Sequence, residues 1–449
     1  MTKRLVSITS GLLNRIIQIP SPLVRRMIPV VLPFLERHPR LLALARRIHF
    51  SLWHFRVRVT ASRWETAADL DRTYWVSPDK IEYTWDSASM EDRNKYLHRG
   101  QIIGGDWDRR RVRFVDFGIG VYQAFQSRFM NGTPWEDTEF YRLALKVISA
   151  GSPAWGCHNQ GEFDERCRRL DALFEDMKTN GYRSQQDIAR SENNPMKGED
   201  EVTVRVGRDG ALLFEDGQHR LAMAKLLHIE RIPVKITARH SEWCEFKKEL
   251  VDYARSQEKL GGVLYHPVTH PDLTDVFAHY DDKRFDLIKS HLPFSGGDLL
   301  DIGANLGYFC HRFEEEGFNC YAVETYAPTV YFAEKLRIAE NRRFKVIGGS
   351  IFDYREKSDF DVVLALNVFH HFLKTERNYQ NLVSLLNRLR TRVMFFQTDH
   401  PDSDQMKGAY KNYSFDEFIE FILQNSNLTE AKRIGETENG RPIYRLQAI

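Results

Sequence analysis

The chain has 449 residues, of which 42% are hydrophobic and 28% are charged. This composition is that of a soluble globular protein, and the length exceeds what one ordinary core requires, so we expect two or three domains. The five cysteines form no Cys-x-x-Cys pair and no cluster with histidine at metal-ligand spacing. A structural zinc is therefore not expected, and reduced cysteines in a cytoplasmic protein fit best.

Residues 1–60 are predicted to form a basic, partly helical arm. They contain eleven Lys or Arg and one acidic residue, so the arm carries +10 and the remaining chain −8 of the net +2. The apolar runs IIQIPSPLV and MIPVVLPFL are too short to span a membrane, and no secretory cleavage site follows an apolar core.

Two interpretations of this arm stay open. Its arginines and the aromatic run HFSLWHF suit peripheral docking on an anionic membrane surface. Alternatively, the arm packs on the acidic body or on a second subunit. The second interpretation is favoured, because prolines 20, 22, 29, 33 and 39 break any long helix.

A middle domain is predicted at 61–255. Its early part contains GGDWD (104–108), a turn with two carboxylates flanking a tryptophan, which could serve an active site or stack on carbohydrate. The alternative interpretation is a packing plug at a domain edge. A helix follows at WEDTEFYRLALKVI, with Thr133 or Asn131 as its cap.

The core of the middle domain is predicted at about 166–240. A helix ends at Gly181, and SENNPMKGED forms an exposed loop. There follow the strand VTVRV, the turn GRDG, the strand ALLF, the turn DGQHR, the helix LAMAKLL and the strand IPVKI. Because DGQHR opens into a helix, free backbone N–H groups face whatever binds there, and the adjacent arginine favours phosphate.

This segment resembles the ParB/sulfiredoxin superfamily, whose members place a Gly-x-His-Arg or Gly-x-x-Arg turn before the helix and Ile-Pro-Val after it. DGQHR is close to the Asp-Gly-His-His-Arg of its free-serine kinases. The resemblance implies a site for ATP, ADP or CTP with Mg²⁺, formed by Asp216, Gly217, His219 and Arg220. His219 and Arg220 would contact phosphates, and Asp216 would help a metal or an acceptor hydroxyl.

One residue departs from the pattern of the superfamily, and one alternative interpretation stays open. Gln218 stands where sulfiredoxins have their reactive cysteine, so redox chemistry is not expected. The nucleotide site could also have decayed into a scaffold or a substrate-binding module.

The third predicted domain spans residues 262–449 and contains the most informative motif of the chain. LLDIGANLGYF (299–309) is an apolar strand followed by a glycine-containing turn, and Glu324 closes the next apolar segment, YAVE. Such a turn lets a nucleotide-like ligand approach the backbone, and the acidic residue can accept hydrogen bonds from ribose hydroxyls. Asn305 stands where a dinucleotide fingerprint has glycine, so NAD is disfavoured.

The stretch DIGANLG resembles motif I of the class I S-adenosylmethionine-dependent methyltransferases. SIFDY places Asp353 after a third strand, and FDVVLALNVFHHF places Asn367 after a fourth, in the order of that family. The resemblance implies a doubly wound Rossmann-like α/β sheet, preceded by the smaller α+β ParB/sulfiredoxin-like domain.

The resemblance also assigns roles in binding S-adenosylmethionine. Asp301 and Gly303 would cradle its methionine part, in a turn completed by Asn305 and Gly307. Glu324 would hold the ribose, Asp353 the adenine amine, and Asn367 would line the methyl-transfer side.

His370 and His371 are the candidate general bases for a hydroxyl acceptor, with His371 preferred. The alternative is that they cap the helix that begins there. NVFH lacks the Asp/Asn-Pro-Pro-aromatic motif of nucleobase amino-methyltransferases, so an exocyclic-amine DNA substrate is disfavoured. The chain then continues with the helix ERNYQNLVSLLNRLR, the strand TRVMFFQTD and a hairpin turning at Asn439-Gly440.

We therefore expect an enzyme that methylates a hydroxyl, phosphate or carboxylate of a small molecule, sugar or lipid-linked glycan. The middle domain would bind a nucleotide or phosphorylate the same substrate. A DNA-associated ParB-like protein is the alternative, but the −8 charge outside the arm argues against a nucleic-acid partner. A non-catalytic scaffold is a third possibility, and the oligomeric state is not predicted.

Overall fold

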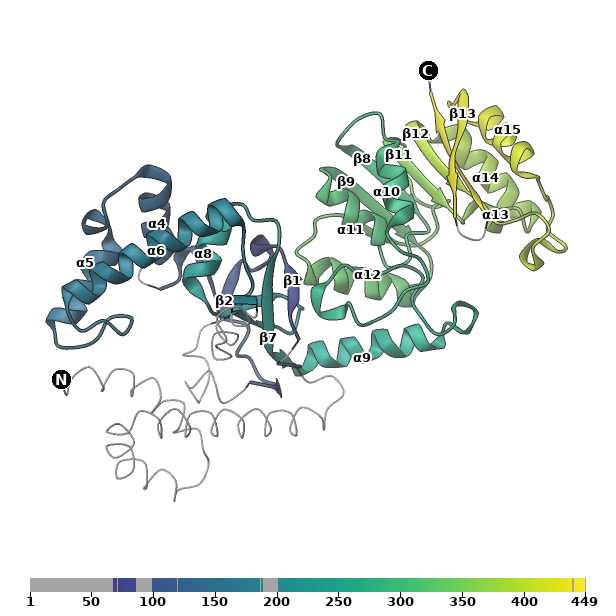
Figure 1. Cartoon of the computed structure of the whole chain (residues 1–449). Coiled ribbons are helices and arrows are strands. Elements are labelled where there is room, and N and C mark those ends of the chain that lie inside the picture. Colours follow the sequence, from purple (N-terminus) through teal and green to yellow (C-terminus); the bar gives the residue numbers. More distant parts are fainter. Residues whose placement is uncertain are drawn as a thin grey trace. The chain divides into compact units, whose positions relative to one another are not determined.

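The computed structural model describes residues 68–70, 72–85, 99–118, 120–185, 187–188, 201–437 and 440–448. The basic arm and the loop SENNPMKGED lie outside these residues, so the expectations for them stay predictions. The chain divides into two compact units, of which the first ends at Lys248 and the second begins at Glu249. Each unit has its own sheet (Figure 1).

The first unit contains a seven-stranded mixed sheet with the order β1-β7-β5-β6-β2-β4, and β3 pairs with the end of β7. Its strands are β1 (Tyr74–Val76), β2 (Tyr83–Trp85), β3 (Gln101–Ile103), β4 (Arg111–Arg113), β5 (Val202–Val206), β6 (Leu212–Asp216) and β7 (Ile232–His240). Its helices are α4 (Val121–Phe125), continued by the π-helix η4 (Gln126–Met130), and α5 (Glu139–Ser149), α6 (Gln160–Asn180) and α8 (Gln218–Leu226). α9 (Ser241–Ser256) leads from this unit into the second.

The predicted succession of strand, strand, helix and strand between residues 202 and 236 is confirmed. α8 begins at Gln218, however, so His219 and Arg220 lie in the first helical turn rather than in the loop before it. The caps predicted for the helix WEDTEFYRLALKVI, Thr133 or Asn131, were wrong. Thr138 caps α5 by accepting a hydrogen bond from the Tyr141 N–H, because Trp135–Asp137 forms a separate 3-10 turn.

The second unit contains a seven-stranded sheet with the order β10-β9-β8-β11-β12-β14-β13. Its strands are β8 (Gly297–Ile302), β9 (Phe318–Glu324), β10 (Lys345–Gly348), β11 (Asp359–Leu366), β12 (Arg390–Gln397), β13 (Glu430–Glu436) and β14 (Pro442–Gln447). Its helices are α10 (Lys283–Ser290), α11 (Tyr308–Glu315), α12 (Ala327–Ala339), α13 (Phe369–Phe372), α14 (Glu376–Arg388) and α15 (Phe415–Asn425). Strands β8 to β12 run parallel, and β14 runs antiparallel to β12 and β13. The predicted C-terminal hairpin is thus confirmed, although Asn439 of its turn is outside the described residues.

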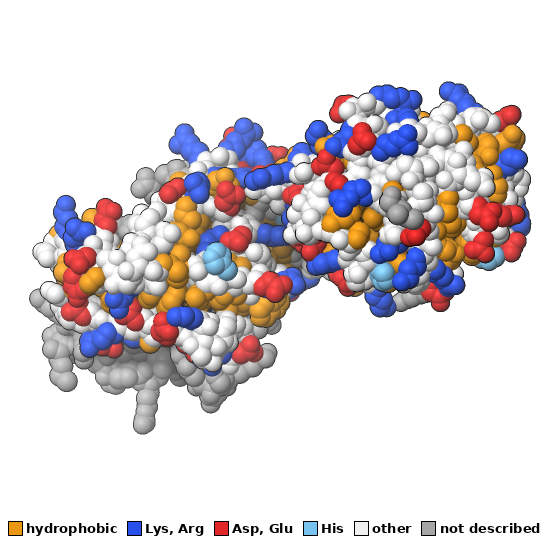
Figure 2. All heavy atoms as spheres, turned by 90° about the horizontal axis from the view of Figure 1, so that it is seen from above, with side chains coloured by type: hydrophobic (Ala, Val, Ile, Leu, Met, Phe, Trp, Pro, Cys, Tyr) orange, Lys and Arg blue, Asp and Glu red, His pale blue; other side chains and the backbone are white. Residues whose placement is uncertain are grey.

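Both faces of this second sheet are buried. Leu299 and Leu364 pack with residues of α10 and α11, whereas Leu300 and Val363 pack with residues of α14 and α15. Strands buried on both faces read as continuous apolar runs, which explains why LLDI and VVLAL show no alternation. On the face shown in Figure 2, acidic and basic side chains are interspersed over the surface of this unit.

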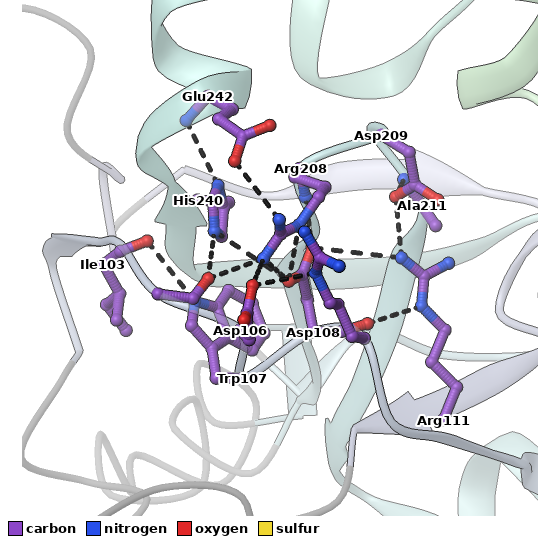
Figure 3. A network of polar contacts seen from close by, with 12 residues as sticks. Ile103, Asp106, Trp107, Asp108, Arg111, Arg208, Asp209, Ala211, His240 and Glu242 are labelled. Carbon is purple, nitrogen blue, oxygen red and sulfur yellow. Dashed lines mark hydrogen bonds and ion pairs between the residues drawn. The ribbon is translucent and has the colours of Figure 1, made fainter.

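The GGDWD segment of the first unit is part of a network of polar contacts (Figure 3). The fully buried Asp108 accepts hydrogen bonds from the backbone N–H and Nε of Arg208, at 2.6 and 3.0 Å. Arg208 lies in the turn between β5 and β6 and also donates to Asp106. Trp107 is only 3% exposed, and its ring lies 5.9 Å from that of His240. This geometry favours the packing interpretation of GGDWD.

Replacing Asp108 should therefore cost stability. Burial opposes its ionisation, but the hydrogen bonds from Arg208 hold the pKa of the Asp108 carboxyl below its usual value. Asp108→Ala leaves Arg208 without its main partner, and we expect a loss of roughly 3 kcal/mol in the free energy of unfolding, measured by urea denaturation. Asp106→Ala is the matched control: its side chain is 71% exposed, so the loss should stay below about 1 kcal/mol. Equal losses for both variants would contradict this role of Asp108.

Candidate functional site

The carboxyl ends of five parallel strands meet at one edge of the second sheet. Asp301 lies near the end of β8, Glu324 ends β9, Asp353 follows β10, Asn367 follows β11 and Asp399 follows β12. The strand order reverses between β8 and β11, and in open α/β sheets ligands bind in the crevice at such a point. The topology thus gathers the four acidic and amide residues singled out in the sequence and adds Asp399.

The turn after β8 follows a backbone path that favours glycine. Gly303, Asn305 and Gly307 all have left-handed backbone conformations, with φ of +75°, +53° and +80°. A Cβ on Gly303 would lie 3.2 Å from Cγ2 of Val368, so a side chain there would crowd the turn after β11. Asparagine tolerates positive φ better than other non-glycine residues, which explains why Asn305 substitutes for glycine.

Glu324 ties this turn to the end of β9. Its Oε2 accepts from the Asn305 N–H at 2.8 Å, and its Oε1 accepts from the N–H groups of Thr325 and Tyr326 at 2.7 and 2.9 Å. The Thr325 hydroxyl also donates to Oε1, at 3.5 Å. Oε2 accepts the Asn305 bond alone among the described residues, so its second lone pair can accept from a ribose hydroxyl. Asp353 lies in the turn after β10 with its side chain exposed, so it is accessible to a ligand.

Asp301 is a buried carboxylate with an unused acceptor. The residue is 2% exposed, and Oδ2 has no hydrogen-bond partner among the described residues. Burial and the nearby charge of Glu324 raise the pKa of Asp301 to about 7, and Arg284 opposes this increase. A buried carboxylate in this state is destabilising until a cationic donor reaches it.

Asn367 presents a second unused acceptor. Its Nδ2 donates to the Tyr265 hydroxyl at 3.0 Å and to Gln397 Oε1 at 3.2 Å. These two bonds fix the amide orientation, and Oδ1 is left buried without a partner among the described residues. Asn367 also has φ of +58°, a left-handed conformation that asparagine tolerates better than other non-glycine residues.

Sequence reasoning missed the residues that hold Asn367. Gln397 is fully buried at the end of β12, where a polar residue closing the apolar run MFF was the available signal. Its Oε1 also accepts from Nη1 of Arg284 at 2.9 Å. Arg284 and His266, which hydrogen-bond each other, carried no sequence signal because both lie outside the motifs.

The two candidate bases have different surroundings. His370 is 3% exposed, its Nδ1 accepts from the Asp399 N–H at 3.4 Å, and burial together with His371 lowers its pKa to about 3. His371 is exposed, and its ring centre lies 4.1 Å from that of His370. Desolvation and Lys374 lower the pKa of His371, so both imidazoles are neutral near pH 7.

In the first unit, the DGQHR turn also forms a polar cluster. Gly217 has φ of +92° and its N–H donates to Asp216 Oδ1 at 2.9 Å. Burial and the charges of Arg166 and Arg220 lower the pKa of His219 to about 4, and its buried Nε2 has no partner among the described residues. The charges of two arginines thus act on a neutral imidazole in the first turn of α8, and the charge of Asp216 opposes them. Arginines at a helix N-terminus suit an anion.

Several further features bear on the expected cofactors and location. All five cysteines are buried free thiols. Within the described ranges, no three His, Cys, Asp or Glu residues are placed to hold a metal ion. No helix among the described residues is both long and apolar enough to cross a membrane.

Comparison with known families assigns part of the chain. A family model for a methyltransferase domain matches residues 275–431, which include the turn after β8 and the ends of β8 to β12. The second unit therefore carries a methyltransferase domain. No curated protein matches the chain.

Solved structures similar to the chain include methyltransferases. The bifunctional kinase-methyltransferase WbdD shares 20% identity over 42% of this chain and 45% of its own, with a TM-score of 0.36. The chain thus covers less than half of that structure. A 1,6-didemethyltoxoflavin-N1-methyltransferase from Burkholderia thailandensis was solved with its substrate and S-adenosylhomocysteine. It shares 18% sequence identity over 36% of this chain and 75% of its own, with a TM-score of 0.30. The N-methyltransferase NodS from Bradyrhizobium japonicum shares 14% sequence identity over 37% of this chain and 94% of its own, with a TM-score of 0.31.

The variant Asp301→Asn should weaken ligand binding without lowering the stability of the fold. Because the folded-state pKa of Asp301 is raised to about 7, the folded state binds the proton more tightly, and stability falls as pH rises from the unfolded value towards 7. At pH 8 we expect the variant without ligand to melt at or above the wild-type temperature, while its affinity for S-adenosylhomocysteine falls roughly 10- to 100-fold.

Asp298→Asn is the control on the same strand. Its carboxylate has a pKa lowered by a hydrogen bond from Lys357, so this variant should lose a little stability and keep its affinity. Thermal melting at pH 6 and pH 8, with and without ligand, measures both effects. Unchanged affinity in Asp301→Asn would remove Asp301 from the binding site.

Proposed function

We propose that the protein is an S-adenosylmethionine-dependent methyltransferase that acts on a hydroxyl of a small molecule, sugar or lipid-linked glycan. The observation that carries this proposal is the pair of buried, unpartnered acceptors, Asp301 Oδ2 and Asn367 Oδ1, at the point where the strand order reverses. Both can accept a hydrogen bond from an ammonium group, such as that of a methionine moiety. The reduced cysteines support a cytoplasmic location.

The residues at the crevice fit this cofactor. Gly303 avoids a side chain that would crowd Val368, Glu324 keeps a lone pair on Oε2 for ribose, and the exposed Asp353 can accept from the adenine amine. The bound cofactor supplies a methyl group activated by a sulfonium, so the protein has to hold the acceptor in line and remove its proton.

His371 is the better placed of the two candidate bases. Its imidazole is exposed and neutral near pH 7 because its pKa is lowered, so it can take a proton from an acceptor hydroxyl. His370 already uses Nδ1 to accept from the Asp399 N–H, and Asp399 is held in turn by Arg441 at 2.8 Å. We therefore assign His370 to positioning and His371 to proton removal.

The first experiment is binding and transfer with the full chain. S-adenosylmethionine and S-adenosylhomocysteine should raise the melting temperature, because each binds only the folded state. Transfer of labelled methyl groups is then measured to a panel of sugars, sugar phosphates and lipid-linked glycans. Failure of both ligands to shift the melting temperature would contradict the proposal.

The histidines give a sharper test with an acceptor from that panel. His371→Gln should lower the rate of methyl transfer roughly 100-fold, because proton removal contributes about 10²- to 10⁴-fold. Its affinity for S-adenosylhomocysteine should stay within about twofold, since ligand binding needs no proton transfer at this residue. His370→Gln is the comparison and should mainly lower the melting temperature. A His371→Gln rate equal to the wild type would exclude His371 as the base.

A second candidate function belongs to the first unit. We propose that the DGQHR turn binds the phosphates of a nucleotide, ATP, ADP or CTP with Mg²⁺. His219 Nε2, buried without a partner among the described residues, and the two arginines that lower the pKa of that histidine favour an anionic ligand. Whether a phosphoryl group is then transferred to an acceptor depends on the substrate.

Nucleotide binding is tested separately from cofactor binding. ATP, CTP or pyrophosphate with Mg²⁺ should raise the melting temperature of the wild type, and Arg220→Met or Arg166→Met should reduce this shift because each removes a cation near His219. Arg168→Met is the control, since Arg168 is exposed on the same helix as Arg166 and pairs with Glu165. No shift with any nucleotide would dismiss this second function and leave the first intact.

A further inference from the structure

The turn after β12 contains a buried carboxylate with one oxygen that the fold does not use. The side chain of Asp399 is 2% exposed, and its Oδ1 is paired with Nη2 of Arg441 at 2.8 Å. Oδ1 also accepts from the His400 N–H at 2.9 Å, whereas the buried Oδ2 has no hydrogen-bond partner among the described residues. The hydroxyl of Ser403 in the same turn lacks a partner too, so it does not donate to Asp399. Because a buried acceptor without a partner is costly, Oδ2 points to a donor supplied by a ligand.

Asp399 lies beside the two candidate bases. β11 and β12 are neighbours in the sheet, so the residues that follow their carboxyl ends come together. The Asp399 N–H donates to Nδ1 of His370 at 3.4 Å, and the ring centre of His370 lies 4.1 Å from that of His371. The charge of Asp399 acts on both imidazoles. A ligand held at His371 is therefore within the neighbourhood of the Asp399 carboxylate.

The surroundings of Asp399 define the group that Oδ2 can bind. An ionised carboxylate only accepts hydrogen bonds, so its partner has to be an O–H or N–H group. Arg441 already balances the charge of Asp399, and its backbone oxygen is fixed by a hydrogen bond from Gln397 Nε2 at 3.2 Å. A neutral hydroxyl is therefore sufficient, and no ammonium group is required. A phosphate or a carboxylate is mostly ionised near pH 7, so Asp399 would repel it at this position.

We propose that Asp399 Oδ2 accepts a hydrogen bond from a second hydroxyl of the methyl acceptor, next to the hydroxyl from which His371 removes the proton. The acceptor is then a polyol such as a sugar unit with two neighbouring hydroxyls, rather than a simple alcohol, a phosphate or a carboxylate. This inference rests on the proposed function and narrows its substrate class. Arg441 acts as a positioning residue, because it holds Asp399 through Oδ1 and leaves Oδ2 to the ligand.

The hydroxyl bound by Asp399 is not itself methylated. The neighbouring oxygen forms the new bond to the methyl carbon while its proton passes to His371. The bond between the methyl carbon and sulfur breaks, and its electron pair stays on sulfur. Asp399 thus contributes to recognition of the acceptor and takes no proton.

The wild-type chain alone provides the first test. Transfer of labelled methyl groups is measured to the methyl glycosides of glucose, galactose and mannose, to their deoxy derivatives at each ring position, and to the corresponding sugar phosphates. For the glycoside that is methylated fastest, loss of the hydroxyl bound by Asp399 should lower kcat/KM roughly 10- to 100-fold, as expected for a hydrogen bond to a charged group. Equal values of kcat/KM for the parent and for every deoxy derivative that keeps the methylated hydroxyl would overturn the inference. Methylation of a phosphate group but of no sugar hydroxyl would also overturn it.

The variant Asp399→Asn locates this dependence in the chain. It keeps the size of the side chain and removes the charge, so kcat/KM should fall for the parent glycoside and change little for the deoxy derivative. The ratio of the two values should therefore fall towards one, while the affinity for S-adenosylhomocysteine stays within about twofold. Asp402→Asn is the matched control, because Asp402 lies in the same turn with a side chain that is 90% exposed. Its ratio should equal that of the wild type.

The outcomes separate the inference from the proposed function. If neither S-adenosylmethionine nor S-adenosylhomocysteine raises the melting temperature of the wild type, the proposed function fails and the inference fails with it. If both ligands bind but no sugar is methylated, or if the ratio is unchanged in Asp399→Asn, only the inference fails. An equal loss of kcat/KM for the parent and the deoxy acceptor in Asp399→Asn would likewise overturn it, because it would show that Asp399 acts only on the fold.

Discussion

The reversal of strand order between β8 and β11 is the constraint on which the second unit depends. Parallel strands on either side of the reversal send their following helices to opposite faces, so the edge between them stays open. Every candidate cofactor residue lies at that edge, although the residues are separated by up to 66 positions of sequence between Asp301 and Asn367. The apolar strands of the sheet thus place the polar groups.

Because the apolar layers stabilise the sheet, the crevice can hold buried charges that are not paired with each other. Asp301 and Arg284 are both buried, yet neither forms an ion pair with the other within the described residues. Direct contact would stabilise each charge and close the space between them. Keeping them apart costs stability, and the cost is tolerable because the two apolar layers on the sheet supply most of the folding free energy.

The sequence predicted the secondary-structure elements far better than the contacts between side chains. Strand ends, the glycine turn and the C-terminal hairpin follow from local patterns, so the order of apolar runs is sufficient to place DIGANLG, YAVE and NVFHHF at one edge of a sheet. Arg284 could not be placed in this way, because its hydrogen-bond partner Gln397 lies more than a hundred residues away in the chain. Thr138 was missed for a related reason, since a 3-10 turn shortens the helix that the pattern suggested.

The two units contain the same kind of backbone turn, but the charged side chains near the turn differ. In each, a left-handed glycine after a strand turns the chain into a helix, at Gly217 before α8 and at Gly307 before α11. In the second unit the buried Asp301 and Asn367 each keep one acceptor oxygen without a partner among the described residues. In the first unit the charges of Arg166 and Arg220 act on a neutral His219, and the charge of Asp216 opposes them. The same kind of backbone turn therefore precedes a helix in both units, and the charges near it differ: two arginines act on His219, whereas the carboxylate of Glu324 acts on Asp301.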